Sequence, residues 1–181
     1  MLSSFALAVV LTLADDAGVL DAGTTAPPAP PQAPAVAPTI FNGVWELDLK
    51  ASSDIKPLMD LLDVGGITRL LAPGVVTTQT ITATAEKLEL KVSSTFKNRA
   101  STWKFDGTTA ALDEVFDNKL EVTSRFVDGA VVSTGTLHIE GGTIPVTMRR
   151  FIDGARMVQE TTFSPKGRDP LVVRRVFNRK K

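Results

Sequence analysis

Residues 119–139 read KLEVTSRFVDGAVVSTGTLHI, and this stretch decides the fold class. Two runs rich in β-forming residues, 119–127 and 130–139, flank the pair Asp128-Gly129. An Asp-Gly pair readily adopts the positive φ angles that a tight hairpin turn needs. Similar runs, separated by similar turn residues, lie on both sides, at 76–83, 86–96, 98–106, 109–117, 143–152, 155–163 and 170–179. Short strands at this regular spacing predict an all-β barrel or sandwich.

A further strand and a helical stretch precede these runs. Residues 41–50 alternate between apolar and polar side chains, which is typical of a strand. Residues 54–72 place apolar side chains at helical spacing, and Gly65-Gly66 divides them into two short helices. Ten strands with a helix pair after the first indicate a ten-stranded up-and-down antiparallel β-barrel. A barrel of this kind is wide enough for one small ligand.

Composition excludes several classes of function. The 181 residues carry 20 basic and 20 acidic side chains, so the chain lacks the basic excess expected of a nucleic-acid-binding protein. It has no cysteine, and therefore no disulfide or thiolate nucleophile. The one histidine, His138, lies in an expected strand and is interpreted as a surface or packing residue. We therefore expect no metal and no cofactor.

The first 40 residues differ from the rest. Residues 2–13 are apolar but too short to span a bilayer, which suits the apolar region of a secretory signal, so 1–20 is interpreted as a signal segment. Residues 21–40 are rich in Pro and Ala and predict an extended linker. The barrel domain is then 41–181, where 20 basic and 17 acidic residues give a net charge of +3. This organisation predicts an extracytoplasmic protein, periplasmic or secreted, with a cytoplasmic location as the alternative.

Arg175 is the candidate site residue that the strand pattern itself indicates. At a period of two it shares a face with Leu171, Val173 and Phe177, and this apolar face should point inward. A buried guanidinium needs an anionic partner. That partner is either an internal carboxylate or the head group of a ligand, unless the side chain extends to the rim of the barrel.

Short motifs across residues 41–181 resemble the intracellular lipid-binding proteins, which include the fatty-acid-binding and cellular retinoid-binding proteins of the calycin superfamily. Each motif is weak alone, but they occur in the expected order and spacing. They are Phe41-Asn42-Gly43-Val44-Trp45, Val64-Gly65-Gly66-Ile67-Thr68-Arg69, Ser94-Thr95-Phe96-Lys97-Asn98, Leu112-Asp113-Glu114 followed by Val127-Asp128-Gly129, Arg149-Arg150-Phe151-Ile152-Asp153-Gly154 and Arg175-Val176-Phe177.

The resemblance implies that the helix pair forms a helix-turn-helix lid over a ten-stranded barrel with an internal cavity. It further implies a carrier role and no catalysis. It also implies that an arginine pair, at Arg149 and Arg175, holds the ligand head group, with Phe177 at the position of the family's tyrosine. Periodicity alone would instead favour Arg150 as the inward residue of its strand, because Ile144, Val146, Met148 and Ile152 lie on the face opposite Arg149. Phe96 and the helix pair are expected to guard the entrance.

Three residues depart from the family pattern. Phe177 has no hydroxyl, and the chain contains no tyrosine that could replace it. Pro145 interrupts an expected strand, which predicts a bulge or a local loss of pairing. Glu160 is expected to point into the cavity beside Arg149, where its carboxylate could neutralise the guanidinium.

These features predict non-enzymatic binding and transport of a small hydrophobic ligand, such as a long-chain fatty acid. The expected partners are this ligand and, through the helix lid, a transient membrane contact; the chain is expected to be a monomer. The alternative is an extracytoplasmic interaction module whose closed barrel is filled by its own side chains. An enzyme using Glu160 for acid–base chemistry is the third interpretation, weaker because a lone buried acid is more often a salt-bridge partner.

Overall fold

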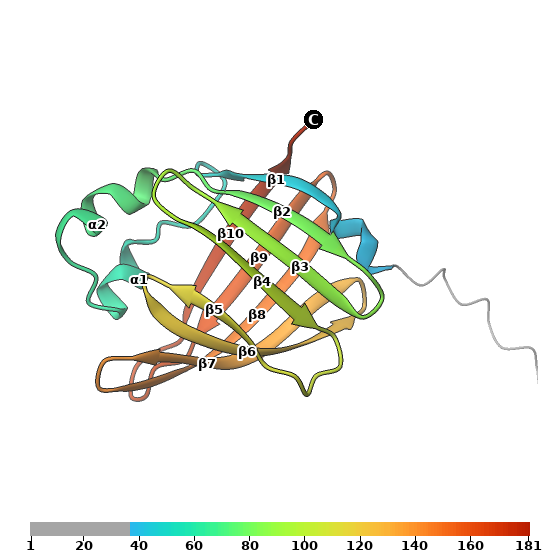
Figure 1. Cartoon of the computed structure of the whole chain (residues 1–181). Coiled ribbons are helices and arrows are strands. Elements are labelled where there is room, and N and C mark those ends of the chain that lie inside the picture. Colours follow the sequence, from blue (N-terminus) through green and yellow to red (C-terminus); the bar gives the residue numbers. More distant parts are fainter. Residues whose placement is uncertain (1–36) are drawn as a thin grey trace, which may run out of the picture. The chain divides into compact units, whose positions relative to one another are not determined.

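The computed structural model describes residues 37–181, which form a barrel of ten antiparallel strands (Figure 1). The strand order β4-β3-β2-β1-β10-β9-β8-β7-β6-β5 confirms the predicted up-and-down topology. The strands are β1 (Gly43–Asp48), β2 (Thr78–Ala83), β3 (Lys87–Ser93), β4 (Asn98–Lys104), β5 (Ala111–Val115), β6 (Asn118–Val127), β7 (Ala130–Ile139), β8 (Gly142–Asp153), β9 (Arg156–Phe163) and β10 (Leu171–Arg179).

The predicted signal segment 1–20, and all but the last residues of the predicted linker 21–40, lie outside the described residues. Within 37–181, no helix is both long and apolar enough to cross a membrane.

The hairpin between β6 and β7 forms as the Asp-Gly pair predicts. Asp128 and Gly129 have φ angles of 49° and 72°, and the ladder starts at the adjacent pair Val127 and Ala130. Farther along the hairpin, Gly135 permits a close approach of the two strands, because a Cβ there would lie 1.9 Å from the carbonyl oxygen of Glu121.

Pro145 leaves the β7 ladder intact and coincides with the end of the β9 ladder. It lies opposite Thr136 of β7, whereas pairing with β9 begins only at Val146. The carbonyl of Pro145 still accepts a hydrogen bond from the Ser164 amide at 2.9 Å. The predicted loss of pairing is therefore confined to one side of the strand.

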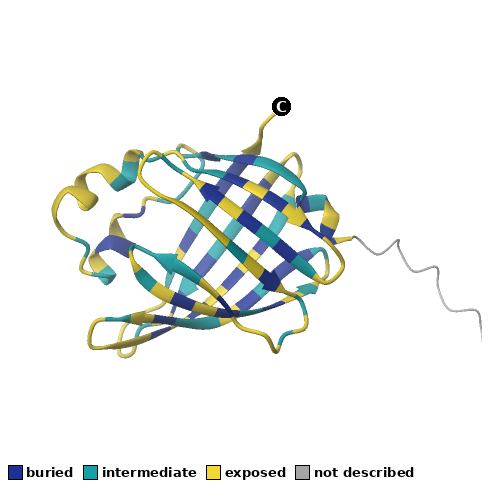
Figure 2. Cartoon of the chain, viewed as in Figure 1, coloured by how far each residue is buried: buried dark blue, intermediate teal, exposed yellow. Residues whose placement is uncertain are grey.

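Two short helices, α1 (Lys56–Leu61) and α2 (Gly66–Leu71), cover one end of the barrel (Figure 1). A 3-10 turn, η2 (Ala72–Gly74), follows α2. The first helix anchors the lid, since Leu58 and Met59 are buried. The second helix buries no residue, and Figure 2 shows it almost entirely exposed. The lid is thus held by α1, while α2 faces solvent.

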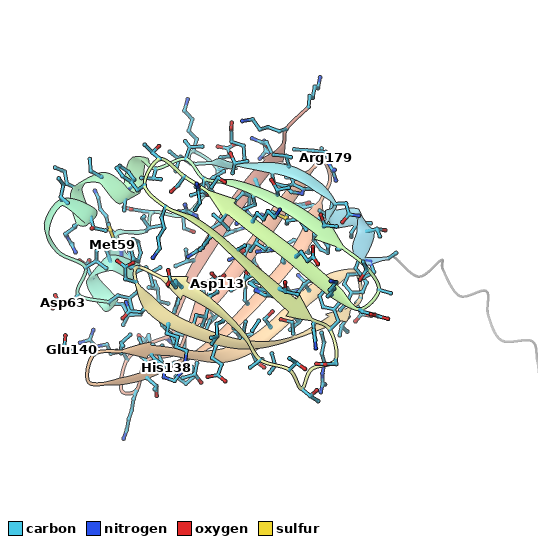
Figure 3. All side chains as sticks on the ribbon, in the orientation of Figure 1. Met59, Asp63, Asp113, His138, Glu140 and Arg179 are labelled. Carbon is cyan, nitrogen blue, oxygen red and sulfur yellow. The ribbon has the colours of Figure 1, made fainter. Side chains whose placement is uncertain are left out.

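The opposite end is sealed by a 3-10 helix, η1 (Pro38–Phe41) (Figure 1). Phe41 is fully buried, and the Trp45 indole donates a hydrogen bond to its carbonyl at 2.8 Å. Arg179, labelled at this end in Figure 3, donates to the carbonyls of Ile40 and Asn42 and lies 4.2 Å above the Trp45 ring. Packing of the domain therefore begins at Pro38, before the predicted boundary at 41.

The barrel wall has a seam between β4 and β5, the two strands at the ends of the sheet order. Side chains close the half of this seam that contains the start of β4. Lys97 pairs with Glu114 at 2.5 Å and with Asp117 at 3.0 Å, and Arg99 pairs with Asp113 at 3.3 Å. Ion pairs therefore take the place of a backbone ladder in this part of the wall.

The other half of the seam is closed by apolar packing and one main-chain contact. The Phe105 ring lies 6.0 Å from that of Phe126 on β6, and the Gly107 amide donates to the Ser124 carbonyl at 3.1 Å.

Candidate functional site

Three polar side chains occupy adjacent positions on the inner face of β8, β9 and β10. The register places Arg150 opposite Gln159, and Gln159 opposite Arg175. Directly opposed residues of antiparallel strands point to the same side of the sheet. Arg150 is 1% exposed, so that side is the interior. We call Arg150, Gln159 and Arg175 the inner polar row.

The Arg150 guanidinium is held by contacts with two side chains, but only part of its hydrogen-bonding capacity is used. One of its nitrogens, Nη2, donates to Gln159 Oε1 at 2.6 Å, and the guanidinium lies 5.0 Å from the centre of the Trp103 ring. Its Nε and Nη1 are buried and have no hydrogen-bond partner among the described residues. Burial lowers the pKa of Arg150 to about 10, and the negative charge of Asp113 opposes this shift. Two donors of a buried cation are thus left for an acceptor that the barrel itself does not supply.

Arg175 is the second cation of the row. Burial lowers its pKa, although both it and Gln159 keep part of their surface accessible. Neither Arg150 nor Arg175 forms an ion pair with any residue in 37–181. The inner polar row therefore presents two positive charges that no carboxylate in 37–181 pairs with directly.

The prediction that Arg149 points inward is wrong. Along β8, Ile144, Val146, Met148 and Arg150 are buried, whereas Arg149 is exposed and lies 4.5 Å above the Phe151 ring. Strand alternation leaves no other choice, because neighbouring residues point to opposite faces. The pattern-based preference for Arg150, rather than the position inferred from the resemblance, gives the correct face.

The prediction that Glu160 enters the cavity is also wrong. Glu160 lies opposite Arg149, as expected, but both are on the outer face. Its carboxylate pairs with Arg174, whose Nε lies 3.4 Å away. It cannot neutralise the inner polar row, because the strand separates the two.

The two predicted aromatic residues lie in different surroundings. Phe177 is 2% exposed and packs in the core, two residues after Arg175 on the same face. Phe96 is 64% exposed and belongs to the turn between β3 and β4. Figure 1 shows this turn at the end of the barrel where α2 lies. Phe177 thus contributes apolar packing beside the row, and Phe96 contributes an exposed ring near the lid.

Gln159 and Trp103 were not predicted as site residues. The alternation of Met157, Gln159, Thr161 and Phe163 along β9 could have placed Gln159 on the inner face. Trp103 meets Arg150 from β4, which is not adjacent to β8 in the sheet, so no local sequence pattern indicates this contact.

Much of the interior is occupied by large apolar side chains. Trp45, Leu88, Trp103, Leu120 and Leu137 are at most 1% exposed. Two hollows, of about 250 and 270 Å³, lie along β6 and β7, and between α1 and the turn leading into β10. Neither of these two hollows is lined by the inner polar row.

The solved structures with the same fold include lipid-binding proteins of low sequence identity. Lipid binding protein 8 of Caenorhabditis elegans is 18% identical with a TM-score of 0.65, covering 80% of this chain and 99% of its own. A Schistosoma mansoni fatty acid binding protein, solved with arachidonic acid, is 21% identical with a TM-score of 0.64, covering 81% and 100%. The REP1-NXSQ fatty acid transporter is 19% identical with a TM-score of 0.63, covering 78% and 97%.

No protein-family model matches the chain, and comparison with curated proteins finds no relative. The structural matches establish that residues 37–181 have the fold of the fatty-acid-binding proteins.

Proposed function

We propose that this barrel binds and carries a small hydrophobic ligand with an anionic head group, in the simplest case a long-chain fatty acid. The observation that carries the proposal is the inner polar row, with two buried or half-buried guanidiniums that have no ion-pair partner among residues 37–181. The names of the structural neighbours, a fatty acid transporter and fatty acid binding proteins, support the same ligand class.

Two contributions favour binding, one from the charged head group of the ligand and one from its acyl chain. A carboxylate accepting from Arg150 Nε or Nη1 forms a charge-assisted hydrogen bond, the strongest class available to these donors. An acyl chain displaces water from apolar surface at about 0.8 kcal/mol for each buried CH₂. Gln159 positions the Arg150 guanidinium, and the half-exposed Arg175 meets the ligand on the more accessible side of the row.

We also propose that the lid makes a transient contact with membranes, and that the protein acts as a monomer. Ile67 and Leu70 on α2 are 73% and 78% exposed, and Phe96 adds a third apolar side chain on the helix side. Exposed apolar side chains concentrated in this way favour contact with an apolar surface. Such a contact would deliver the ligand at the end of the barrel that α1 and α2 cover.

The closed interaction module remains the second candidate, and one observation favours it. The interior contains fully buried tryptophans and leucines, and the two hollows lie away from the inner polar row. An enzyme is disfavoured, because the acid proposed for catalysis, Glu160, lies on the outer face in an ion pair. We further propose an extracytoplasmic location, which mass analysis of the mature chain tests by locating its first residue.

Titration calorimetry with a matched fatty acid, alcohol and methyl ester tests the proposal. The acid should bind, and Arg150→Gln should weaken its binding by about 1.5–3 kcal/mol, the scale of a hydrogen bond to a charged group. The alcohol and ester should be affected much less. Arg149→Gln is the matched control and should leave all three affinities unchanged. If no lipid binds the wild type, the closed module replaces the carrier.

A further inference from the structure

A second unpaired polar group lies inside the barrel, on β2. Gln79 is 7% exposed and shares the inner face with Ile81 and Ala83. Its neighbours across the two flanking ladders are Trp45 and Val92. The Oε1 atom is fully enclosed and has no hydrogen-bond partner among the described residues.

Several other polar side chains on the inner face have partners. Ser124 and Ser133 are hydrogen-bonded to each other at 2.7 Å, and Asp113 pairs with Arg99. Thr161 accepts from Gln159. Apart from the free donors of Arg150, Gln79 is the buried side chain in 37–181 that keeps an unused polar atom. Enclosing such an atom is unfavourable, whereas an apolar side chain of similar size would suit this wall of tryptophan and aliphatic residues.

We propose that Gln79 binds a hydroxyl group carried in the middle of the ligand's acyl chain, so that the preferred ligand is a hydroxylated fatty acid. The inference rests on the proposed function, which places the carboxylate of the same ligand at the inner polar row. A hydroxyl both donates and accepts. It therefore matches the Gln79 amide whichever way the amide is turned. A hydroxyl is also small and uncharged, so an acyl chain can carry it without bringing a second charge into the barrel.

The register sets how far the hydroxyl lies from the carboxylate. Gln79 is opposite Trp45, and Trp45 is opposite Arg179, which is four residues beyond Arg175 on β10. With strand spacings of about 4.8 Å and a rise of about 3.3 Å per residue, the Cα atoms of Gln79 and Arg175 are separated by roughly 16 Å along the wall. Both side chains point into the barrel and shorten this span. The hydroxyl of the ligand should therefore lie several carbons from its carboxylate, and not on a carbon beside it.

The test compares saturated acids of one chain length by titration calorimetry. One has no hydroxyl, and the others carry it beside the carboxylate, in mid-chain or at the far end. The wild type should bind the mid-chain isomer about tenfold more tightly than the plain acid, the difference expected when a buried acceptor gains its partner. Gln79→Met should remove this preference. Thr80→Val, on the exposed outer face of the same strand, is the matched control and should retain it.

The outcomes separate this inference from the proposed function. If the plain acid binds as tightly as every hydroxylated isomer, the Gln79 amide is satisfied by water and the inference is wrong, while the carrier function holds. If none of the acids binds, the proposed function itself fails. Gln79→Leu provides a second apolar replacement should Gln79→Met fold poorly, and unfolding in urea establishes which variant is folded. A preference for the mid-chain isomer that survives both substitutions would also overturn the assignment to Gln79.

Discussion

Replacing Arg150 by Met should make the ligand-free protein more stable. Burial lowers the pKa of Arg150 to about 10, and this corresponds to a penalty of about 3 kcal/mol on the charged side chain, at about 1.4 kcal/mol for each pKa unit. Part of the stability gained by removing this buried charge is offset. Gln159 loses the donor bound at 2.6 Å, and the Trp103 ring loses the guanidinium above it. Since Gln159 is partly accessible to water, we assign about 1–2 kcal/mol to these losses. The net expectation is a gain of about 1–2 kcal/mol.

Urea unfolding measures this change, and the neighbouring residue supplies the control. Arg149→Met alters the same strand by the same chemistry on the exposed face, and should change the free energy of unfolding by no more than about 0.5 kcal/mol. The stabilised Arg150→Met protein should at the same time lose its affinity for fatty acids. If Arg150→Met instead destabilises the empty protein by more than about 1 kcal/mol, the guanidinium is a structural element and the reasoning about an uncompensated charge fails.

Three further predictions concern the seam, the sealed end and alkaline pH. Raising the salt concentration from about 0.05 M to about 0.5 M should speed hydrogen exchange in β4 and β5 but not in β7 and β8. The reason is that salt screening weakens the Lys97 and Arg99 ion pairs. Equal changes in all four strands would refute this. Phe41→Ala should lower the free energy of unfolding by about 3–5 kcal/mol in urea, since the ring is fully buried, whereas a loss under 1 kcal/mol would show that η1 is not part of the core. As the pH rises through about 10, the unfolded chain retains a proton on Arg150 that the folded protein releases, so wild-type stability should increase relative to Arg150→Met; parallel pH profiles would contradict the lowered pKa.

The strands and their order could be predicted because the signals are local. Turn pairs such as Asp128-Gly129 mark where the chain reverses, and an unbroken series of hairpins places each strand beside the next. The two helices were predicted from apolar spacing and from the break at Gly65-Gly66, and they differ from the expected range only at their ends.

The site was predicted less well, and Arg149 shows why. The resemblance assigned the arginine by its place in a motif, where a shift of one residue reverses the face. The alternation of buried residues through Met148 carries the physical information, and it selects Arg150. Glu160 was misplaced for the same reason, because its assignment also came from the motif and not from its own strand.

Contacts between distant strands could not be predicted from the sequence. Trp103 reaches Arg150 across the barrel, and the seam ion pairs join β4 to β5 without a ladder. Closure of the barrel brings these residues together, and no periodic pattern in either strand specifies the partner. Likewise, Pro38 belongs to a proline-rich stretch by composition, and only its burial shows that it packs with the domain.

The central claim is that the inner polar row binds an anionic head group, and the titration of that head group tests it most directly. A fatty acid labelled with ¹³C at its carboxyl carbon would be followed by NMR as the pH is lowered. Pairing with Arg150 and Arg175 should hold the pKa of the bound carboxyl below the value of the free acid, because a nearby positive charge favours the carboxylate. Arg150→Gln should raise that pKa, and Arg149→Gln should leave it unchanged. A bound carboxyl that titrates at the pKa of the free acid in the wild type would contradict the account.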